Sequence, residues 1–231
     1  MPKTYLLTKS KYIRGLQCEK AMFLDVYKPK LARYSPETLA KFKQGRAFEK
    51  EYKDTFPAGI DVSKRLGWKM DQYPVLTADL LRQEGEVDLF EAGFLYDDVL
   101  VLADVVHKQA DGKVIVYEVK NSLAVSDTFA NDVAIQYYVI SHAMGRIGGA
   151  DLFGEGLRLD QFNLLYHNEE GEFVSEDLTQ RAHEMGAGIP ERLKHFKDVL
   201  RADEPQTEIS PHCDIPYECP YKQYCAMIAK D

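Results

Sequence analysis

Charged residues interrupt two of the most apolar stretches of this chain. Asp104 follows Val-Leu-Val-Leu-Ala, and Glu118 and Lys120 follow Val-Ile-Val-Tyr with one valine between them. Burying such charges is costly unless an opposite charge compensates them. Two carboxylates can hold Mg²⁺ or Mn²⁺, and a lysine beside them can stabilise negative charge that develops on phosphorus. The three residues therefore predict a metal site suited to phosphodiester hydrolysis.

A second interpretation of the same residues is an ion pair at a strand edge. Asp104 and Lys120 would then pair with each other, and Glu118 would lie in solvent. A Glu-X-Lys triplet alone does not distinguish the two. The longer pattern favours the metal site, because 13 residues with a turn signal separate Asp104 from Glu118 and apolar runs precede both carboxylates.

The elements that must position these charges are three predicted strands. Alternation and β-branched content predict strands over 89–96, 99–106 and 113–120. Asp97-Asp98 and Asp111-Gly112 are typical of tight turns between antiparallel strands. Since successive side chains of a strand alternate between its two faces, Glu118 and Lys120 share one face. The hairpin then places Asp104 on the neighbouring strand.

Further elements complete an α/β or α+β chain with a central mixed sheet flanked by helices. Helices are predicted over 4–25, from Ser35-Pro36-Glu37 to about Phe56, over 129–144 and over 176–200. A fourth strand is predicted over 161–167, with a turn at Glu170-Gly171 into 172–174. At 231 residues the chain fits a single domain, 1–231.

The charge is unevenly distributed. The net charge is -8, yet residues 1–53 hold 13 Lys and Arg against 5 Asp and Glu. Such a basic segment suits contact with nucleic-acid phosphates, although lysines coating amphipathic helices would look the same. The sequence has neither a long apolar run nor an apolar signal core between Met1 and Arg14. It therefore predicts a cytoplasmic protein without a membrane partner.

Four cysteines form a second candidate site. One is early and three are late: Cys18, Cys213, Cys219 and Cys225. Disulfides are rare in the cytoplasm, so four thiols indicate a metal site. Zinc sites usually have closely spaced cysteine pairs, whereas this wide spacing with Pro220 after a cysteine favours a [4Fe–4S] cluster. Zinc and free thiols remain alternatives, and His212 is a substitute ligand or a neighbour.

The segment from Asp104 to Lys120 resembles the core of the PD-(D/E)XK nuclease superfamily, in its RecB-like branch. The resemblance implies a restriction-endonuclease-like fold, with Asp104, Glu118 and the carbonyl of Val119 on the metal and Lys120 catalytic. That branch has Gly-X-X-X-His on the preceding helix. Here Gly45 is followed by Glu49, which implies a glutamate ligand in place of histidine.

A later motif of the branch is incomplete in this chain. The pattern is Gln-X-X-X-Tyr, and here Gln136 is followed by Ile140. The resemblance implies that Gln136 faces the catalytic site and leaves the tyrosine contact in doubt. Glu91, a lone charge on the first strand, is either a neighbour of the site or solvent-facing.

The cysteines extend the resemblance. RecB-like nucleases with an iron–sulfur cluster, among them AddB nuclease domains and the CRISPR-associated exonuclease family Cas-four, also have one early and three late cysteines. Their usual late spacing is Cys-x2-Cys-x5-Cys, whereas the tail here, His-Cys-x5-Cys-Pro-x4-Cys, is similar to a bacterial branch of RecB-like proteins. By this resemblance 1–35 and 205–231 form the cluster region and 36–200 the nuclease core, and the cluster ties the tail to the first helix.

The resemblance implies a Mg²⁺- or Mn²⁺-dependent deoxyribonuclease, an exonuclease preferring single strands or ends, with a protein partner in repair, recombination or defence. DNA phosphates would be contacted by Lys9, Lys11, Arg14 and Lys20, then Lys28, Lys30 and Arg33. Tyr5, Tyr12, Tyr27 and Tyr34 would stack on bases or pack against the core. The alternatives are a non-catalytic nucleic-acid-binding module of the same fold and, more remotely, an electron-carrying cluster protein.

Overall fold

The computed structural model describes residues 6–145, 152–154 and 156–229. The chain forms two compact units. The first is built from Met1–Lys9 and Gly45–Ala187, and the second from Ser10–Gln44 and Gly188–Asp231. The described residues include no helix that is both long and apolar enough for a membrane span. Tyr5 lies outside the described residues.

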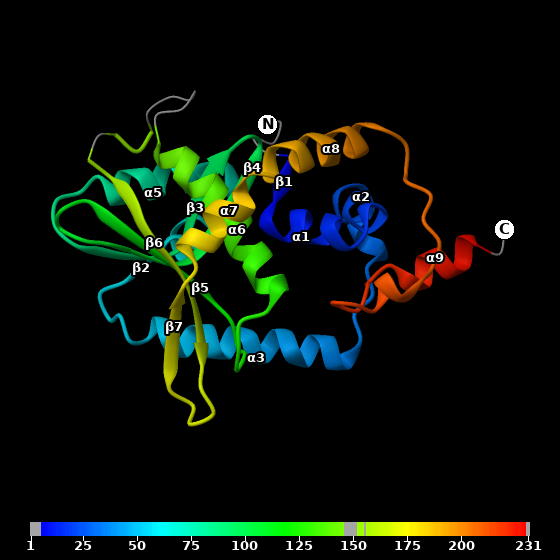
Figure 1. Ribbon diagram of the computed structural model, residues 1–231, viewed down its shortest axis with the longest axis horizontal. Coiled ribbons are helices and arrows are strands. Elements are labelled where there is room, and N and C mark those ends of the chain that lie inside the picture. The colour runs from blue at the N-terminus through cyan, green and yellow to red at the C-terminus, as the bar shows by residue number, and fades with distance from the viewer. Residues whose placement is uncertain (1–5, 146–151, 155, 230–231) are drawn as a thin grey trace. The chain divides into compact units, whose positions relative to one another are not determined.

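A mixed sheet of seven strands organises the described part of the first unit (Figure 1). Its order is β2-β3-β4-β5-β6-β7, and β1 pairs with β4. The β3–β4 and β4–β5 pairs are antiparallel, β5–β6 is parallel, and β6–β7 is antiparallel. The strands are β1 Leu7–Thr8, β2 Ile60–Asp61, β3 Val87–Tyr96, β4 Val99–Lys108, β5 Lys113–Val119, β6 Arg158–His167 and β7 Phe173–Asp177.

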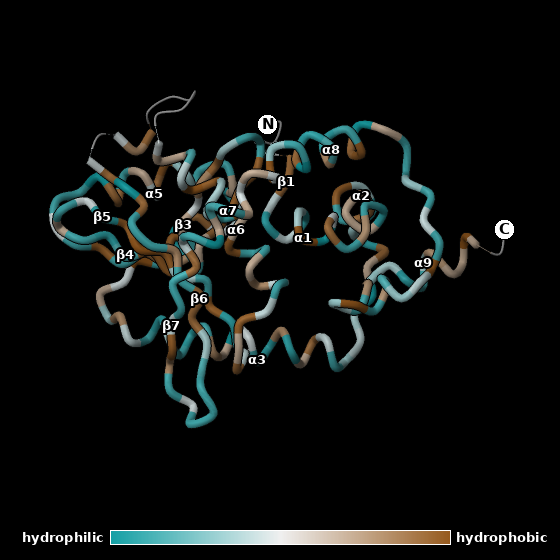
Figure 2. Tube along the Cα trace, in the orientation of Figure 1, coloured by the Kyte–Doolittle hydropathy of each residue, from teal (hydrophilic) through white to brown (hydrophobic). Residues whose placement is uncertain are grey.

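The predicted meander is confirmed. The apolar runs of β3, β4 and β5 form the hydrophobic centre of the sheet (Figure 2). Asp97 and Asp98 both have positive φ, 49° and 59°, as a two-residue hairpin turn requires. Gly112, with φ of 83°, turns β4 into β5. The mixed sheet is confirmed too, because β6 returns parallel to β5 after an intervening helix.

Helices cover both faces of the sheet. On one face α6 (Asp127–Met144) packs on β3, β4 and β6 and against α7 (Thr179–Gly186), and α5 (Tyr73–Leu81) packs on β3. On the other, Phe48 and Tyr52 of α3 (Pro36–Lys53) and the following Phe56 pack on a cluster that includes Phe90 and Val105. The short helix α4 (Val62–Leu66), β2 and α5 fill a stretch for which the sequence patterns made no prediction.

The second unit is helical. Its helices are α1 (Lys9–Gln17, of which Lys9 belongs to the first unit), α2 (Glu19–Tyr27), the part of α3 up to Gln44, α8 (Ile189–Arg201) and α9 (Lys222–Ile228). The ring of Tyr12 meets that of Phe196 edge-on, with centroids 5.6 Å apart. The buried Tyr221 hydroxyl donates to Asp25 Oδ1 at 2.6 Å. Short 3-10 turns at Pro29–Leu31 and Pro211–Cys213 complete the unit, and another at Met70–Gln72 lies in the first.

Two predicted helices are wrong. The predicted helix over 4–25 is interrupted by Cys18, whose backbone is extended with φ of -161° and ψ of 115°, and β1 precedes α1. The predicted helix over 176–200 is β7 ending at Asp177 followed by the two helices α7 and α8. Pro190 lies in the first turn of α8, where proline is tolerated; inside one continuous helix it would remove a backbone donor.

Glycine 93 fixes how closely α5 approaches β3. A Cβ added there would lie 2.4 Å from Tyr73 Cβ, and the Gly93 amide donates to Thr77 Oγ1 at 2.8 Å. We expect Gly93→Ala to destabilise the protein by about 1–3 kcal/mol, because helix and strand must move apart. Gly45→Ala on α3 is the control, since nothing lies within 4 Å of its added Cβ. Urea unfolding measures both, and equal midpoints for the two variants would contradict the prediction.

Candidate metal and catalytic site

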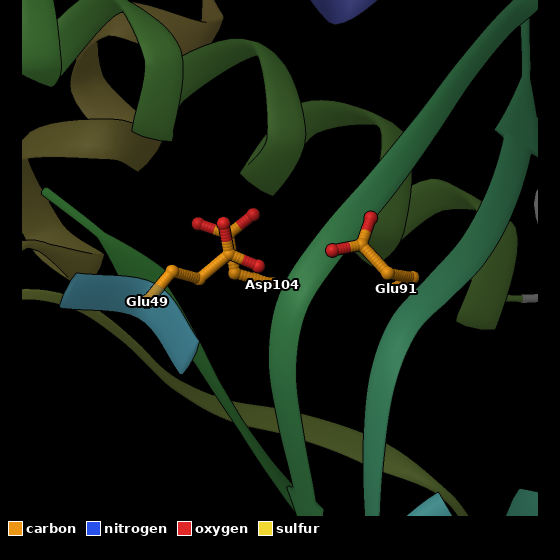
Figure 3. A group of neighbouring side chains, drawn as sticks. All are labelled: Glu49, Glu91 and Asp104. Carbon is orange, nitrogen blue, oxygen red and sulfur yellow. The ribbon is translucent and has the colours of Figure 1, made fainter. Parts of the chain in front are cut away.

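Three carboxylates from three elements converge in the first unit. Glu49 comes from α3, Glu91 from β3 and Asp104 from β4, and one ligand oxygen of each lies within 4.8 Å of the others (Figure 3). Carboxylate oxygens are the ligands that Mg²⁺, Mn²⁺ and Ca²⁺ prefer. The donor set therefore suits a hard divalent cation.

The backbone at Glu91 is unusual for a strand. Between the pairs Phe90–Val105 and Ala92–Ala103, Glu91 lies opposite Asp104 on the neighbouring strand. Its φ is 53°, in the left-handed region that residues other than glycine seldom adopt. Such a conformation costs on the order of 1–3 kcal/mol and gathers at functional sites. Like charges placed opposite each other add to that cost.

The electrostatics of Glu49, Glu91 and Asp104, here called the triad, favour a bound cation. Burial, and then the nearby Glu118 carboxylate, raise the pKa of Asp104 well above its ordinary value, more than Lys9 lowers it. Burial also raises the pKa of Glu91, outweighing the opposing effect of Lys53. Both carboxyl groups therefore resist ionisation until a positive charge compensates them.

A second group of charges surrounds Glu118, which is 1% exposed. Lys9 Nζ donates to Glu118 Oε1 at 2.7 Å and to Oε2 at 2.8 Å. Lys120 Nζ lies 2.6 Å from Glu118 Oε1 and 2.5 Å from Asp132 Oδ2. Gln136 Nε2 donates to Glu118 Oε2 at 2.6 Å. Each Glu118 oxygen is thus engaged by protein donors.

The protonation states of this group follow from its geometry. Burial raises the pKa of Glu118, but Lys120 and Lys9 outweigh burial and hold it well below its ordinary value. The carboxylates of Glu118, Asp132 and Asp104 raise the pKa of Lys120 well above its ordinary value, although burial opposes them. Lys120 therefore remains an ammonium, which can donate hydrogen bonds but cannot accept a proton.

The two groups are adjacent on the sheet. Asp104 Oδ2 accepts a hydrogen bond of 2.8 Å from the Val119 amide, which joins β4 to the residue between Glu118 and Lys120. Of the predicted metal ligands, Glu49 and Asp104 lie in the triad, while Glu118 is outside it. Gln136 is 0% exposed and faces Glu118, and its Oε1 has no hydrogen-bond partner among the described residues.

The sequence patterns did not assign several residues to this site. Glu91 was noted only as a lone charge. Lys9 was assigned to DNA phosphates, yet it binds a carboxylate 109 residues away. Asp132, four residues before Gln136 on α6, had the detectable sign of an acidic side chain on an apolar helix face. Lys53 had no such sign, because it is one of many lysines on α3.

The remaining residues predicted to contact phosphate lie in the second unit. Lys20 is 2% exposed and forms an ion pair with Glu204 at 3.3 Å. Because its ammonium is buried, it cannot contact DNA phosphates, and the prediction for Lys20 is wrong. Arg14 pairs with Asp25 at 3.3 Å and Lys28 with Glu204 at 2.7 Å. Lys11 is half-buried and engaged in an interaction, while Lys30 and Arg33 are exposed. Tyr12 is buried, whereas Tyr27 and Tyr34 are 52% and 39% exposed.

All four cysteines line one cavity of the second unit. Cys213 and Cys219 are buried, and Cys18 and Cys225 are partly buried. The nearby backbone amides of Ala21 and Lys20 lower the pKa of the Cys18 thiol, and that of Tyr221 lowers the pKa of the Cys219 thiol. Burial nevertheless raises the pKa of the Cys18, Cys219 and Cys225 thiols. His212 lines the same cavity, with Nε2 3.6 Å from Cys213 Sγ.

Four thiols around one cavity are a ligand set that a metal ion or an iron–sulfur group accepts. No known protein-family model matches the chain, and no curated protein matches it.

Proposed function

We propose that this chain is a Mg²⁺- or Mn²⁺-dependent DNA nuclease with a PD-(D/E)XK core. The observation that carries the proposal is the convergence of Glu49, Glu91 and Asp104 beside Glu118 and Lys120. The metal would be held by the three triad carboxylates. When bound, a divalent cation polarises a phosphate and activates water.

The residues of the chain would supply the remaining requirements. Lys120, held between Glu118 and Asp132, would donate to a non-bridging phosphate oxygen, where negative charge develops in the transition state. Glu118 and Asp132 orient the ammonium, and Gln136 and Lys9 orient Glu118. Because Lys120 stays protonated, it does not act as the general base.

The substrate we propose is DNA with single-stranded ends, hydrolysed as an exonuclease in repair, recombination or defence, together with a protein partner. Two exposed cations of α3 in the first unit, Arg46 and Lys50, support a polyanionic substrate, because they lie on the same helix as Glu49. Cations near the triad would attract a polyanion and make binding weaken with salt. Single-strand preference and the pathway rest on the family resemblance alone.

For the four cysteines we propose a [4Fe–4S] cluster, held by Cys18, Cys213, Cys219 and Cys225. Cys18 precedes α2, and the other three lie in the C-terminal segment. Such a group would bond the C-terminal segment to Cys18, between α1 and α2, and these bonds would add to the stability that apolar packing provides. Zinc is the alternative for the same thiols.

Asp104→Asn tests the function and has two opposite effects. The variant should lose Mn²⁺ binding and cleavage of single-stranded DNA, because a ligand charge is removed. The metal-free protein should become more stable at pH 7 by about 0.5–2 kcal/mol. The sign follows from the raised pKa of Asp104: a carboxyl group that ionises less readily when folded lowers stability as pH rises above its unfolded value.

The assay is cleavage of end-labelled single-stranded DNA with Mn²⁺, with thermal unfolding in chelator as the stability measurement. Asp79→Asn, an exposed carboxylate on α5, is the matched control and should change neither result. Wild-type cleavage by Asp104→Asn would eliminate the proposed metal site.

A non-catalytic DNA-binding module is the second candidate. The observation in its favour is Lys53, whose ammonium already forms ion pairs with Glu49 and Glu91. A chain in which lysine permanently replaces the metal would bind DNA without cleaving it. Absence of cleavage in the wild-type protein, with DNA binding retained, would favour this module.

A further inference from the structure

Lys53 forms ion pairs with two of the three triad carboxylates, Glu49 and Glu91. It lies one helical turn after Glu49 on α3, ion-pairs with Glu49 Oε1 and lies 2.8 Å from Glu91 Oε1. Its side chain is 12% exposed, and its Nζ lies 5.6 Å from the ring centroid of Phe90. This cation belongs neither to the predicted ligands nor to the group around Glu118.

The Lys53 ammonium and a divalent ion compete for the same oxygens. Glu49 and Glu91, the two carboxylates that Lys53 Nζ already contacts, are two of the three that would hold the metal. A metal bound to Glu91 Oε1 would lie within a few ångströms of an ammonium 2.8 Å from that oxygen. Repulsion between these charges at about 4 Å is strong in a partly buried site.

A neighbouring cavity offers Lys53 another position. The cavity has a volume of about 550 Å³ and is lined by charges of both signs: the carboxylates of Glu49, Asp54, Asp61 and Glu91, and the cations of Arg46, Lys50, Lys53 and Lys64. Asp61 is paired with Lys64, which is 82% exposed and lies 3.5 Å from Asp61 Oδ2, so solvent weakens the pair that Lys53 would displace. Asp61 caps α4 by accepting from the Lys64 amide at 3.2 Å, which holds its carboxylate in place. A flexible lysine can therefore withdraw without losing all its counter-charge.

We propose that Lys53 is an exchangeable internal cation that holds Glu49 and Glu91 together in the metal-free protein and leaves toward Asp61 when a divalent ion binds. Lys53 thereby sets the metal affinity of the site. The inference rests on the proposed metal site, although it does not require that the bound metal cleave DNA.

Calorimetric titration of Mn²⁺ into the full chain tests the exchange without an activity readout. We expect Lys53→Met and Lys53→Gln to bind Mn²⁺ at least about tenfold more tightly than wild type, because the competing charge is gone. Lys53→Arg keeps the charge and should not bind more tightly. Circular dichroism establishes that each variant is folded, and the glutamine variant replaces the methionine variant if the latter is not.

Lys50→Met is the matched control. Lys50 lies on the same helix and lines the same cavity, but it pairs with the exposed Asp54 at 2.5 Å and is 73% exposed. The variant removes one charge, as Lys53→Met does, and its affinity should change by less than about threefold because solvent screens the charge. A tenfold gain in this control as well would reduce the Lys53 effect to net charge and overturn the exchange.

The outcomes separate this inference from the nuclease proposal. Tighter binding in the Lys53 variants with no cleavage by any variant supports the exchange and defeats the nuclease. Unchanged Mn²⁺ affinity with metal-dependent cleavage defeats the exchange and leaves the nuclease. Mn²⁺ binding only after Lys53 is replaced overturns the exchange, because Lys53 then does not leave the wild-type site, and favours the non-catalytic module. Absence of binding in every variant overturns the inference.

Discussion

Lys120→Ala is expected to lower the rate of DNA cleavage by about 100- to 1,000-fold, the usual loss when one donor to a developing oxyanion is removed. The ammonium of Lys120 lies 2.6 Å from Glu118 and 2.5 Å from Asp132, and both carboxylates keep it charged and oriented. The variant should still bind Mn²⁺, because Lys120 is not a ligand of the triad. Single-turnover cleavage of single-stranded DNA, with calorimetry for the metal, measures the two effects separately.

A control lysine is available on the same strand. Lys113 begins β5, is 36% exposed and lies 3.9 Å from the exposed Asp111, so Lys113→Ala removes an equal charge away from the site. Its cleavage rate should remain within about twofold of wild type, since exposed pairs contribute little. Equal, negligible activity in wild type and Lys120→Ala would reject the enzyme and leave the binding module.

Cys225→Ser is expected to remove the proposed iron–sulfur cluster and to unfold much of the second unit. The four thiols line one cavity, beside an apolar cluster that includes Ala21, Leu24 and Tyr221. A group that bonds both to Cys18 and to the tail would contribute several kcal/mol of folding free energy. Iron and sulfide analysis, the visible spectrum of anaerobically purified protein and thermal unfolding follow the loss.

Met227→Ser is the matched control, because Met227 is on the same helix, α9, and is 61% exposed. It should keep the iron, the spectrum and the melting temperature. A colourless wild-type protein with one zinc would replace the iron–sulfur assignment, and a protein with neither metal would leave free thiols. Either result leaves the triad prediction intact, since its ligands are carboxylates in the other unit.

Short-range patterns were sufficient for the meander and for the residues on it. Alternating apolar residues and two turn signals determined β3, β4 and β5 within a few positions, because each pattern depends on neighbours in the chain. The same patterns failed at Cys18, where one extended residue separates α1 from α2, and at Ala187 and Gly188, between α7 and α8. Helical spacing continues across such breaks, so periodicity does not detect them.

By itself, the sequence determined the meander, the pairing of Glu118 and Lys120 on one strand face, and the grouping of four cysteines as a set. Only the tertiary structure decided which carboxylates meet. Glu91, whose own backbone is left-handed, lies near Asp104, and Glu118 binds Lys9, which is 109 residues away in the chain. The physical reason is that side-chain alternation is local, whereas a site needs charges from strands and helices whose approach depends on packing. That packing also determines the position of Lys53 among the carboxylates. The helix α3 carries several lysines, and Lys53 contacts Glu91 because the C-terminal end of α3 lies near β3.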